Sequence, residues 1–400
     1  MKNLYANIEK HLREICLFPS RHVGSPGVAA AADYIGKTFR SYGYTQVTQE
    51  PFPTTGWRFG AMLFADLDNF GKEVPGAQPC FFSRSVDVTD VPVWLTPKEL
   101  GALKPEQVKG RLCIVEFFSD CTDIRGRNGI AEELDRCGAA GAVFFSDPGY
   151  HTARAPSTKI QRSPLLKTLG TAVVAEEGAY YLARNRNHRF KLFINAETFP
   201  CTSHNVAAIR PGTGSNRAVF GAHHDASPIG QGASDNASGV TCVLELSRLL
   251  RDELPGWTFE FVTFDAEEYC ARGMMPCGSE AYVDGHKDRK WAFFMDFDSV
   301  GMFFGEDVLH VGRPELLPEF DSIYRKLPFK NDGDDRNFNR VGVPALWFST
   351  HERFFDFHTP LDTMEKLDIG RLVRFIGEAR RVTRILCADR GAGTQAGAAK

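Results

Sequence analysis

Apolar runs and segments with apolar residues at helical spacing alternate in the second half of the chain. Continuous apolar strands that alternate with amphipathic helices are typical of a parallel sheet with both faces covered. We therefore expect an α/β fold in this half. The expected strands lie at 217–225, 257–268, 291–301 and 343–350, and the expected helices at 237–250, 279–286, 316–327 and 369–386.

Two further helices are expected at the start of the chain. Residues 1–18 carry apolar side chains at helical spacing, and residues 25–43 repeat the pattern. Ser25 is a suitable N-cap, Pro26 suits the first helical position, and Gly43 suits the end of the helix. A strand is expected to follow at 45–52.

The pattern changes between residues 53 and 198, where short apolar runs are separated by proline and glycine turns. One helical segment, 129–140, lies among them. The whole pattern predicts a largely parallel, mixed and twisted sheet with helices on both faces, interrupted by a mostly β inserted domain. The expected parts are a discontinuous α/β domain at 1–52 and 199–388, an insertion at 53–198 and a flexible tail at 389–400.

Net charge and hydropathy argue against nucleic acid and membrane as partners, and cysteine usage bears on the compartment. The formal net charge of −3 argues against nucleic acid, which normally binds a basic surface. No apolar run reaches the ~18 residues that a transmembrane helix needs, so no membrane partner is expected. The N-terminal segment lacks the apolar core of a signal peptide, and the 10 cysteines form no CxxC pair. These features favour a cytoplasmic protein, or a secreted one if a leader has been removed.

Imidazole and carboxylate side chains follow the ends of the expected strands. In open α/β sheets, functional groups gather beyond the carboxyl ends of the strands. Imidazole together with carboxylate is the ligand set of zinc, or less specifically of manganese or cobalt. The candidates are His223, His224, Asp225, Asp235, Asp265, Glu267, Glu268, Asp296, Asp298, His358 and Asp362.

Five short motifs occur in a fixed order: "GAHHD" (221–225), "DNASG" (235–239), "AEE" (266–268), "DSVG" (298–301) and "HTPLD" (358–362). With them, the sequence resembles the co-catalytic zinc aminopeptidase family, which also contains glutamate carboxypeptidases and glutaminyl cyclases. The β-rich insertion resembles the protease-associated domain that many of its members carry.

This resemblance implies a site for two zinc ions, with manganese or cobalt as possible substitutes. Asp235 would bridge the two ions. His223 and Asp298 would complete one site, and Glu268 and His358 the other.

The resemblance also gives roles to residues that bind no metal. Glu267 would be the general base that takes a proton from a water shared by the two ions. His224 is not expected to be a ligand, because neighbouring side chains in a strand point to opposite faces. Asp225 would hold the imidazole of His223, and Asp362 would do the same for His358.

The implied function is a zinc exopeptidase that acts on a peptide or amide and removes N-terminal residues. Alternatives are a single-zinc glutaminyl cyclase, a carboxypeptidase or dedicated amidase on the same scaffold, and a non-catalytic binding scaffold. "DNASG" favours two metals over the cyclase. Two departures from the family pattern affect the substrate pocket: a longer loop at 269–277, and Gly333–Asp335 where the family often has S-D-H.

Overall fold

The computed structural model describes most of the 400-residue chain. The described residues are 2–96, 99, 102–116, 124–145, 166–268, 277–330, 333–352 and 356–392.

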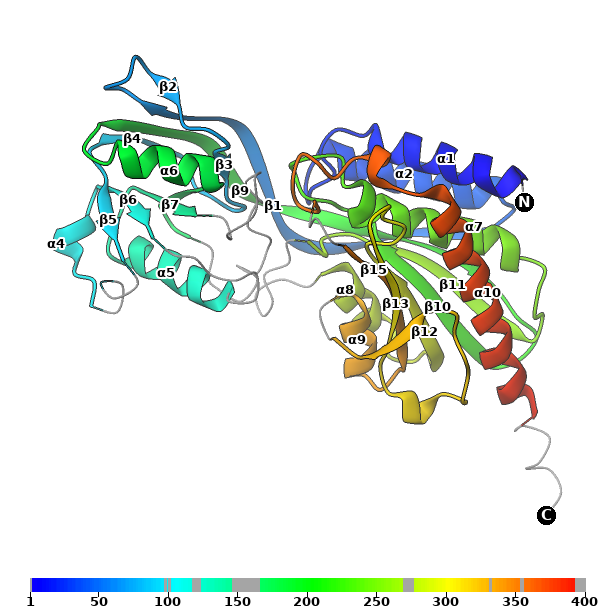
Figure 1. The fold of residues 1–400 in the computed structure, drawn as a ribbon. Helices are drawn as coiled ribbons and strands as arrows, with labels where there is room; N and C mark the ends of the chain where they lie inside the picture. Colours follow the sequence, from blue (N-terminus) through cyan, green and yellow to red (C-terminus); the bar gives the residue numbers. More distant parts are fainter. Residues whose placement is uncertain are drawn as a thin grey trace.

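A ten-stranded mixed sheet forms the centre of the fold (Figure 1). Its main order is β14-β13-β15-β12-β10-β11-β9-β1-β2, and β4 pairs with β9. The central strand β10 is parallel to both β11 and β12, and β12 is parallel to β15. The expected fold class is confirmed. The strands are β1 (Gln46–Asp66), β2 (Lys72–Glu73), β4 (Val86–Asp90), β9 (Phe190–Arg210), β10 (Asn216–His223), β11 (Trp257–Phe264), β12 (Trp291–Phe297), β13 (Gly305–Val311), β14 (Arg325–Pro328) and β15 (Ala345–Glu352).

Helices cover both faces of this sheet (Figure 1). One face packs against α1 (Lys2–Cys16), α2 (Pro26–Ser41), α7 (Gly239–Leu250) and α10 (Ile369–Ala392). The other face packs against α8 (Gly278–Gly285) and α9 (Asp335–Arg340). Helix α2 begins as expected: Val28 N donates to the Ser25 hydroxyl over 3.1 Å.

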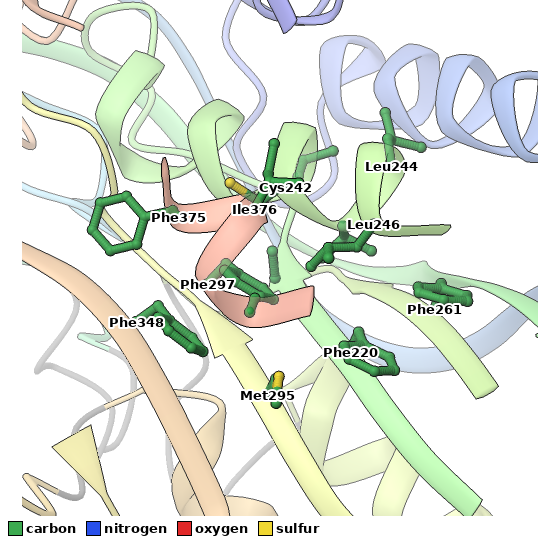
Figure 2. Close-up of a cluster of buried hydrophobic side chains, with 14 of the residues drawn as sticks. Phe220, Cys242, Leu244, Leu246, Phe261, Met295, Phe297, Phe348, Phe375 and Ile376 are labelled. Atoms are coloured by element: carbon green, nitrogen blue, oxygen red, sulfur yellow. The ribbon is translucent and has the colours of Figure 1, made fainter. Parts of the chain in front are cut away.

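Strand β10 shows how the sequence divides between the two faces. Phe220 belongs to the larger core, whereas its neighbour Val219 belongs to the core beneath α8 and α9. Figure 2 shows Phe220 beside Phe261, with rings nearly parallel and their centroids 5.0 Å apart. Apolar residues at the consecutive positions 218–220 of β10 are therefore buried on both faces of the sheet.

The inserted segment contains a second, five-stranded sheet with the order β3-β8-β7-β6-β5. Strands β5, β6, β7 and β8 are parallel, and helices lie between some of them, so the segment carries more helix than its sequence pattern indicates. Its elements are β3 (Gln78–Pro79), β5 (Val93–Leu95), α4 (Pro105–Val108), β6 (Leu112–Val115), α5 (Ile124–Arg136), β7 (Gly141–Phe145), β8 (Gly170–Val174) and α6 (Glu176–Arg184).

Two long strands connect the insertion to the rest of the chain. β1 and β9 pair antiparallel from Gln46↔Ile209 to Asp66↔Phe190 and run continuously into the left half of Figure 1. The expected boundaries at 52/53 and 198/199 lie inside these two strands.

The helix expected at 316–327 is wrong. The chain there forms a short 3-10 helix, η3 (Pro314–Leu316), and then β14, which pairs parallel with β13. Phe320 and Tyr324 are buried four residues apart, which imitates helical spacing, but residues 325–328 pair with β13 instead.

The C-terminal tail was expected to begin at residue 389, but α10 continues to Ala392. Residues 393–400 of that expected tail lie outside the described residues. No helix in the described ranges is long and apolar enough to cross a membrane.

Candidate metal centre

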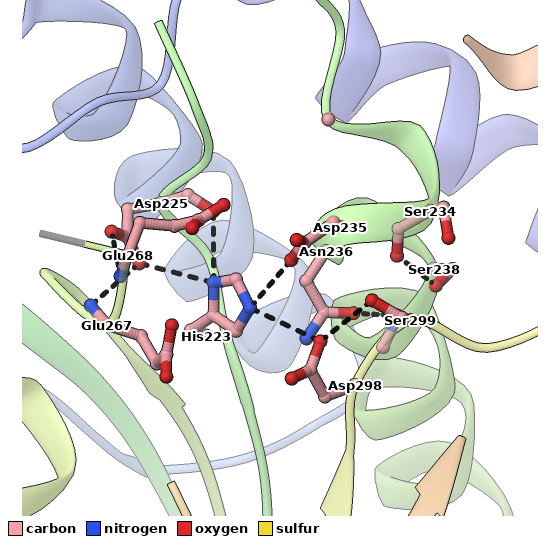
Figure 3. Close-up of polar contacts among 12 residues, drawn as sticks. His223, Asp225, Ser234, Asp235, Asn236, Ser238, Glu267, Glu268, Asp298 and Ser299 are labelled. Atoms are coloured by element: carbon pink, nitrogen blue, oxygen red, sulfur yellow. Dashed lines mark hydrogen bonds and ion pairs between the residues drawn. The ribbon is translucent and has the colours of Figure 1, made fainter. Parts of the chain in front are cut away.

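The predicted ligands come together at the carboxyl ends of the parallel strands. His223 is the last residue of β10, and Asp298 follows the end of β12 at once. Glu267 and Glu268 follow β11, and Asp235 lies in the turn that leads into α7 (Figure 3). His358 comes after β15. The parallel strands β10, β11, β12 and β15 are therefore each followed by, or end in, a residue of the site.

Three residues form the first ligand group. His223 Nε2 lies 3.1 Å from Asp235 Oδ1 and 3.4 Å from Asp298 Oδ1. On the other side of the ring, His223 Nδ1 lies 3.2 Å from the Asp225 carbonyl oxygen and 3.3 Å from its Oδ1. Because Asp225 accepts the Nδ1 proton, Nε2 is left to face the two carboxylates.

A second group shares Asp235 with the first. His358 Nε2 lies 2.9 Å from Asp235 Oδ2 and 2.7 Å from Glu268 Oε2. Asp235 therefore presents one oxygen to each histidine. In each group, one ligand atom per residue lies within 4.8 Å of the others.

Electrostatics of the site reflect an excess of buried carboxylates. Burial opposes a charged imidazole, yet the neighbouring carboxylates raise the pKa of His223 well above 6.5 and that of His358 to about 10. Burial, with the nearby Asp235 charge, raises the pKa of Glu268 to about 7. Burial alone would raise the pKa of Asp235, but its close contacts with the two histidines lower it.

The geometry fits bound metal ions better than it fits a hydrogen-bonded cluster. Despite its short distances to two carboxylates, His358 Nε2 makes a hydrogen bond to no described residue. Its position suits a nitrogen that shares a cation with those oxygens. A divalent ion in each group would balance the carboxylate charge without proton uptake by the imidazoles.

Two aspartates hold the ligand loops through backbone amides. Asp225 accepts from Glu267 N and Glu268 N, each over 3.1 Å. Asp362 accepts from Ser234 N over 2.7 Å and from Asp235 N over 3.1 Å.

The expectation that Asp362 orients His358 is wrong, because His358 Nδ1 has no hydrogen-bond partner among the described residues. Asp362 acts instead on the segment that carries Asp235.

Glu267 is held beside the two groups but belongs to neither. Burial raises the pKa of its carboxyl well above 4.5, with further contributions from Asp298 and Glu268 and an opposing one from His223. The charges that act on it belong to residues of both ligand groups, so the carboxylate of Glu267 lies close to both.

His224 also lies outside both groups. It is buried, and loss of solvation lowers its pKa to about 4.

Several supporting residues were not predicted from the sequence. Asn236 donates through Nδ2 to the Phe297 carbonyl and accepts from Gly239 N, which ties the Asp235 turn to the end of β12. A Cβ at Gly239 would lie 2.0 Å from the Phe297 carbonyl oxygen, which explains the glycine of "DNASG". Arg21, far away in sequence, contacts the same region.

Three non-glycine residues at the site have positive φ: Ala266, Ser299 and His358. His358 is a ligand candidate, Ser299 follows Asp298, and Ala266 lies two residues before Glu268. Such conformations are uncommon and cost free energy, and they tend to gather at functional sites.

The two departures from the family pattern have different outcomes. Residues 269–276 of the longer loop lie outside the described residues. At Gly333–Asp335, Asp335 N donates to Asp296 Oδ2 over 3.0 Å, so this segment joins the end of β12. Burial and the nearby Asp296 charge raise the pKa of Asp334 well above 3.8.

Fold and site together define an α/β protein with a paired carboxylate–imidazole ligand set at the strand ends. Residues 205–382 match the sequence model of peptidase family M28. The recognition of the co-catalytic zinc aminopeptidase family from its motifs is confirmed. The match begins after the insertion, whose resemblance to a protease-associated domain stays a prediction.

Relatives of known name are aminopeptidases. An aminopeptidase of Pseudomonas aeruginosa is 24% identical over 358 residues, covering 84% of this chain. This chain spans 60% of the length of that relative. Aminopeptidase YwaD of Bacillus subtilis is 40% identical over 174 residues, 38% of this chain and 37% of its own length. A probable lipoprotein aminopeptidase of Mycobacterium tuberculosis is 23% identical over 87% of this chain and 77% of its own.

Solved structures share the fold across nearly the whole chain. BSAP, a zinc aminopeptidase from Bacillus subtilis, has a TM-score of 0.74 and 19% identity over 94% of this chain and 93% of its own. An aminopeptidase from Aneurinibacillus sp. has a TM-score of 0.67 and 21% identity over 94% of this chain and 92% of its own.

The expected cytoplasmic location stays a prediction.

Proposed function

We propose that the protein is a di-zinc aminopeptidase that removes N-terminal residues from peptides. The observation that carries this proposal is the sharing of Asp235, whose two oxygens face the imidazoles of two separate ligand groups. A single-metal protein has no need of a carboxylate placed between two complete groups. The relatives named above are aminopeptidases, and BSAP is a zinc aminopeptidase, which supports the same activity here.

Five residues would hold the metals: His223, Asp235, Asp298, Glu268 and His358. When bound, two zinc ions would lower the pKa of a water between them and polarise the carbonyl of the substrate. Glu267 would accept the proton of that water on its carboxylate and deliver it to the departing amine. The buried surroundings that favour a protonated Glu267 also suit it to hold that proton between the two transfers.

Metal analysis combined with a pair of substrates tests the proposal. We expect about two zinc ions per chain, in line with the two ligand groups. The protein should cleave an unblocked aminoacyl anilide but not its N-acetylated form. Cleavage of only the acetylated form would exclude an aminopeptidase. One zinc ion, with ammonia release from N-terminal glutamine, would establish a glutaminyl cyclase instead.

Glu267→Gln separates the base from the metal ligands. The variant should keep both zinc ions, since Glu267 is in neither group, and lose at least about 100-fold in kcat, as expected for a general base. Glu106→Gln, an exposed glutamate on α4, is the matched control and should behave as wild type. Near-normal turnover in Glu267→Gln would show that another group is the base.

A further inference from the structure

Arg21 is a buried arginine that lies between the N-terminal segment and the loop joining His223 to Asp235. It is 1% exposed and ranks among the largest fully buried side chains. All of its hydrogen bonds in the described residues go to backbone carbonyls. A guanidinium has a fixed, planar set of donors, so it can hold several carbonyls in one arrangement.

The guanidinium holds both ends of that loop at once. Arg21 Nε donates to the His224 carbonyl over 3.1 Å. Its Nη1 donates to the Gln231 carbonyl over 2.7 Å, and its Nη2 to the Gly232 carbonyl over 2.8 Å. His224 follows the ligand His223 directly, and Gly232 precedes the ligand Asp235 by three residues. One side chain thus sets the separation of two predicted ligands.

Nearby contacts attach the same loop to the N-terminal segment. Ala226 N donates to the Arg21 carbonyl over 3.2 Å, and the Ser20 hydroxyl donates to the Pro228 carbonyl over 3.3 Å. On its other side the loop is held by Asp362, whose carbonyl accepts from Gln231 N over 3.3 Å. The loop is therefore fixed between two segments that lie far from it in sequence.

The space around the guanidinium leaves no room for a side chain at position 232. Gly232 has a φ of +57°, and a Cβ added there would lie 3.0 Å from Arg21 Nη2 and 2.5 Å from Ala226 Cβ. Arg21 also interacts electrostatically with Asp225, Asp235 and Asp362. A permanent positive charge is thus buried behind the acidic ligand groups without binding a metal ligand itself.

We propose that Arg21 is a positioning residue for the metal centre, which sets the distance between His223 and Asp235 by holding both ends of their connecting loop. This inference rests on the proposed metal centre. Lysine keeps the charge but has no planar fork, so it cannot hold three carbonyls in the same arrangement.

Zinc affinity of Arg21→Lys tests this role without any substrate. We expect it to fall about 10–100-fold, the usual cost of losing support for a metal ligand. The cobalt-loaded variant should show a changed visible absorption spectrum, because the ligand geometry relaxes. Arg210→Lys is the matched control: Arg210 is partly buried and donates to the Leu254 carbonyl, away from the site. It should keep wild-type zinc affinity and spectrum.

Chemical rescue distinguishes positioning from a general effect on folding. In Arg21→Ala, added guanidinium at a concentration that does not denature the protein should restore zinc affinity and the cobalt spectrum, and equal ammonium should not. If Arg21→Lys does not fold, Ser20→Ala decides, because it removes another contact to the same loop. We expect it to lower zinc affinity by a smaller factor.

The outcomes separate this inference from the proposed function. Folded Arg21→Lys with wild-type zinc affinity and an unchanged cobalt spectrum would overturn the positioning role alone. If Arg21→Lys does not fold, wild-type zinc affinity in Ser20→Ala would overturn the positioning role. A wild-type protein that binds neither zinc nor cobalt would overturn both the metal centre and the role of Arg21.

Discussion

At the scale of single residues, Asp225 links two parts of the metal centre. Its carboxylate accepts the amides of Glu267 and Glu268, while it also holds Nδ1 of His223 (Figure 3). Both ligand groups therefore depend on one side chain that binds no metal in the proposed site. Loss of a residue that supports metal ligands in this way typically lowers metal affinity by about 10–100-fold.

We predict that Asp225→Asn lowers zinc affinity about 10–100-fold while the fold is kept. An asparagine oxygen can still accept one backbone amide, but its NH2 group would face the other amide donor. Competition with a chelator of known affinity measures the effect. Asp284→Asn, at an ion pair with Arg340 remote from the site, is the control. Equal affinity in both variants would rule out a supporting role for Asp225.

The sequence predicts which residues meet at the candidate site better than it predicts the contacts that hold them there. His223, Glu268 and Asp298 each follow a buried strand, and parallel strands bring their carboxyl ends to one edge. The partner of Asp362 was mispredicted because both of its carboxylate oxygens accept hydrogen bonds from backbone amides. Every residue except proline has a backbone amide, so the sequence does not indicate which one is the donor. Arg21 was missed for the same reason: its partners are backbone carbonyls, and three of them lie more than 200 positions away.

At the scale of elements, β10 carries His223, a proposed metal ligand, at its buried carboxyl end. Phe220 stacks on Phe261 and meets Phe259 and Phe293 edge-on, so its ring fills the centre of the larger core (Figure 2). Three residues later the same strand presents His223. Packing in the core and ligand position are thus coupled through one short element.

We predict that Phe220→Ala lowers the free energy of unfolding by about 3–5 kcal/mol, because the lost ring leaves a cavity that the sheet cannot close. Urea unfolding followed by tryptophan fluorescence measures the loss. Phe70→Ala is the control, since Phe70 is exposed at the turn before β2, and its effect should stay within about 0.5 kcal/mol. Similar effects of the two substitutions would contradict the packing described for Phe220.

Sequence patterns located the buried strands and long helices, but not the elements at the edge of the sheet. Strands β10, β11, β12 and β15 are continuous apolar runs and were predicted. Strand β14 is partly exposed, and its pairing with β13 is set by tertiary contacts, so its residues carry no strand signal.

At the scale of the whole molecule, the proposed metal centre brings together segments from both ends of the chain. The N-terminal segment holds the loop at 224–232, and the segment at 358–362 supplies His358 and Asp362. All of these groups meet only in the folded state. A ligand that binds the folded state alone stabilises it in proportion to the logarithm of its concentration over its Kd.

We predict that removal of zinc destabilises the protein and that restored zinc reverses the effect. Free zinc at 100 times its Kd should add about 2.7 kcal/mol to the free energy of unfolding for each independent site. The metal-free protein must also keep the buried Asp235 and Glu268 and the half-buried Asp298 near one another without a divalent counter-charge. Thermal unfolding with and without a chelator, followed by zinc titration, measures the difference.

Asp235→Asn is the decisive variant for this prediction. Its side chain keeps its size but loses the charge and one of the two oxygens that face His223 and His358. The metal-free variant should be at least as stable as the metal-free wild type, because one buried carboxylate is gone, while added zinc should stabilise it much less. If zinc stabilises Asp235→Asn as strongly as the wild type, the bridging position of Asp235 is refuted.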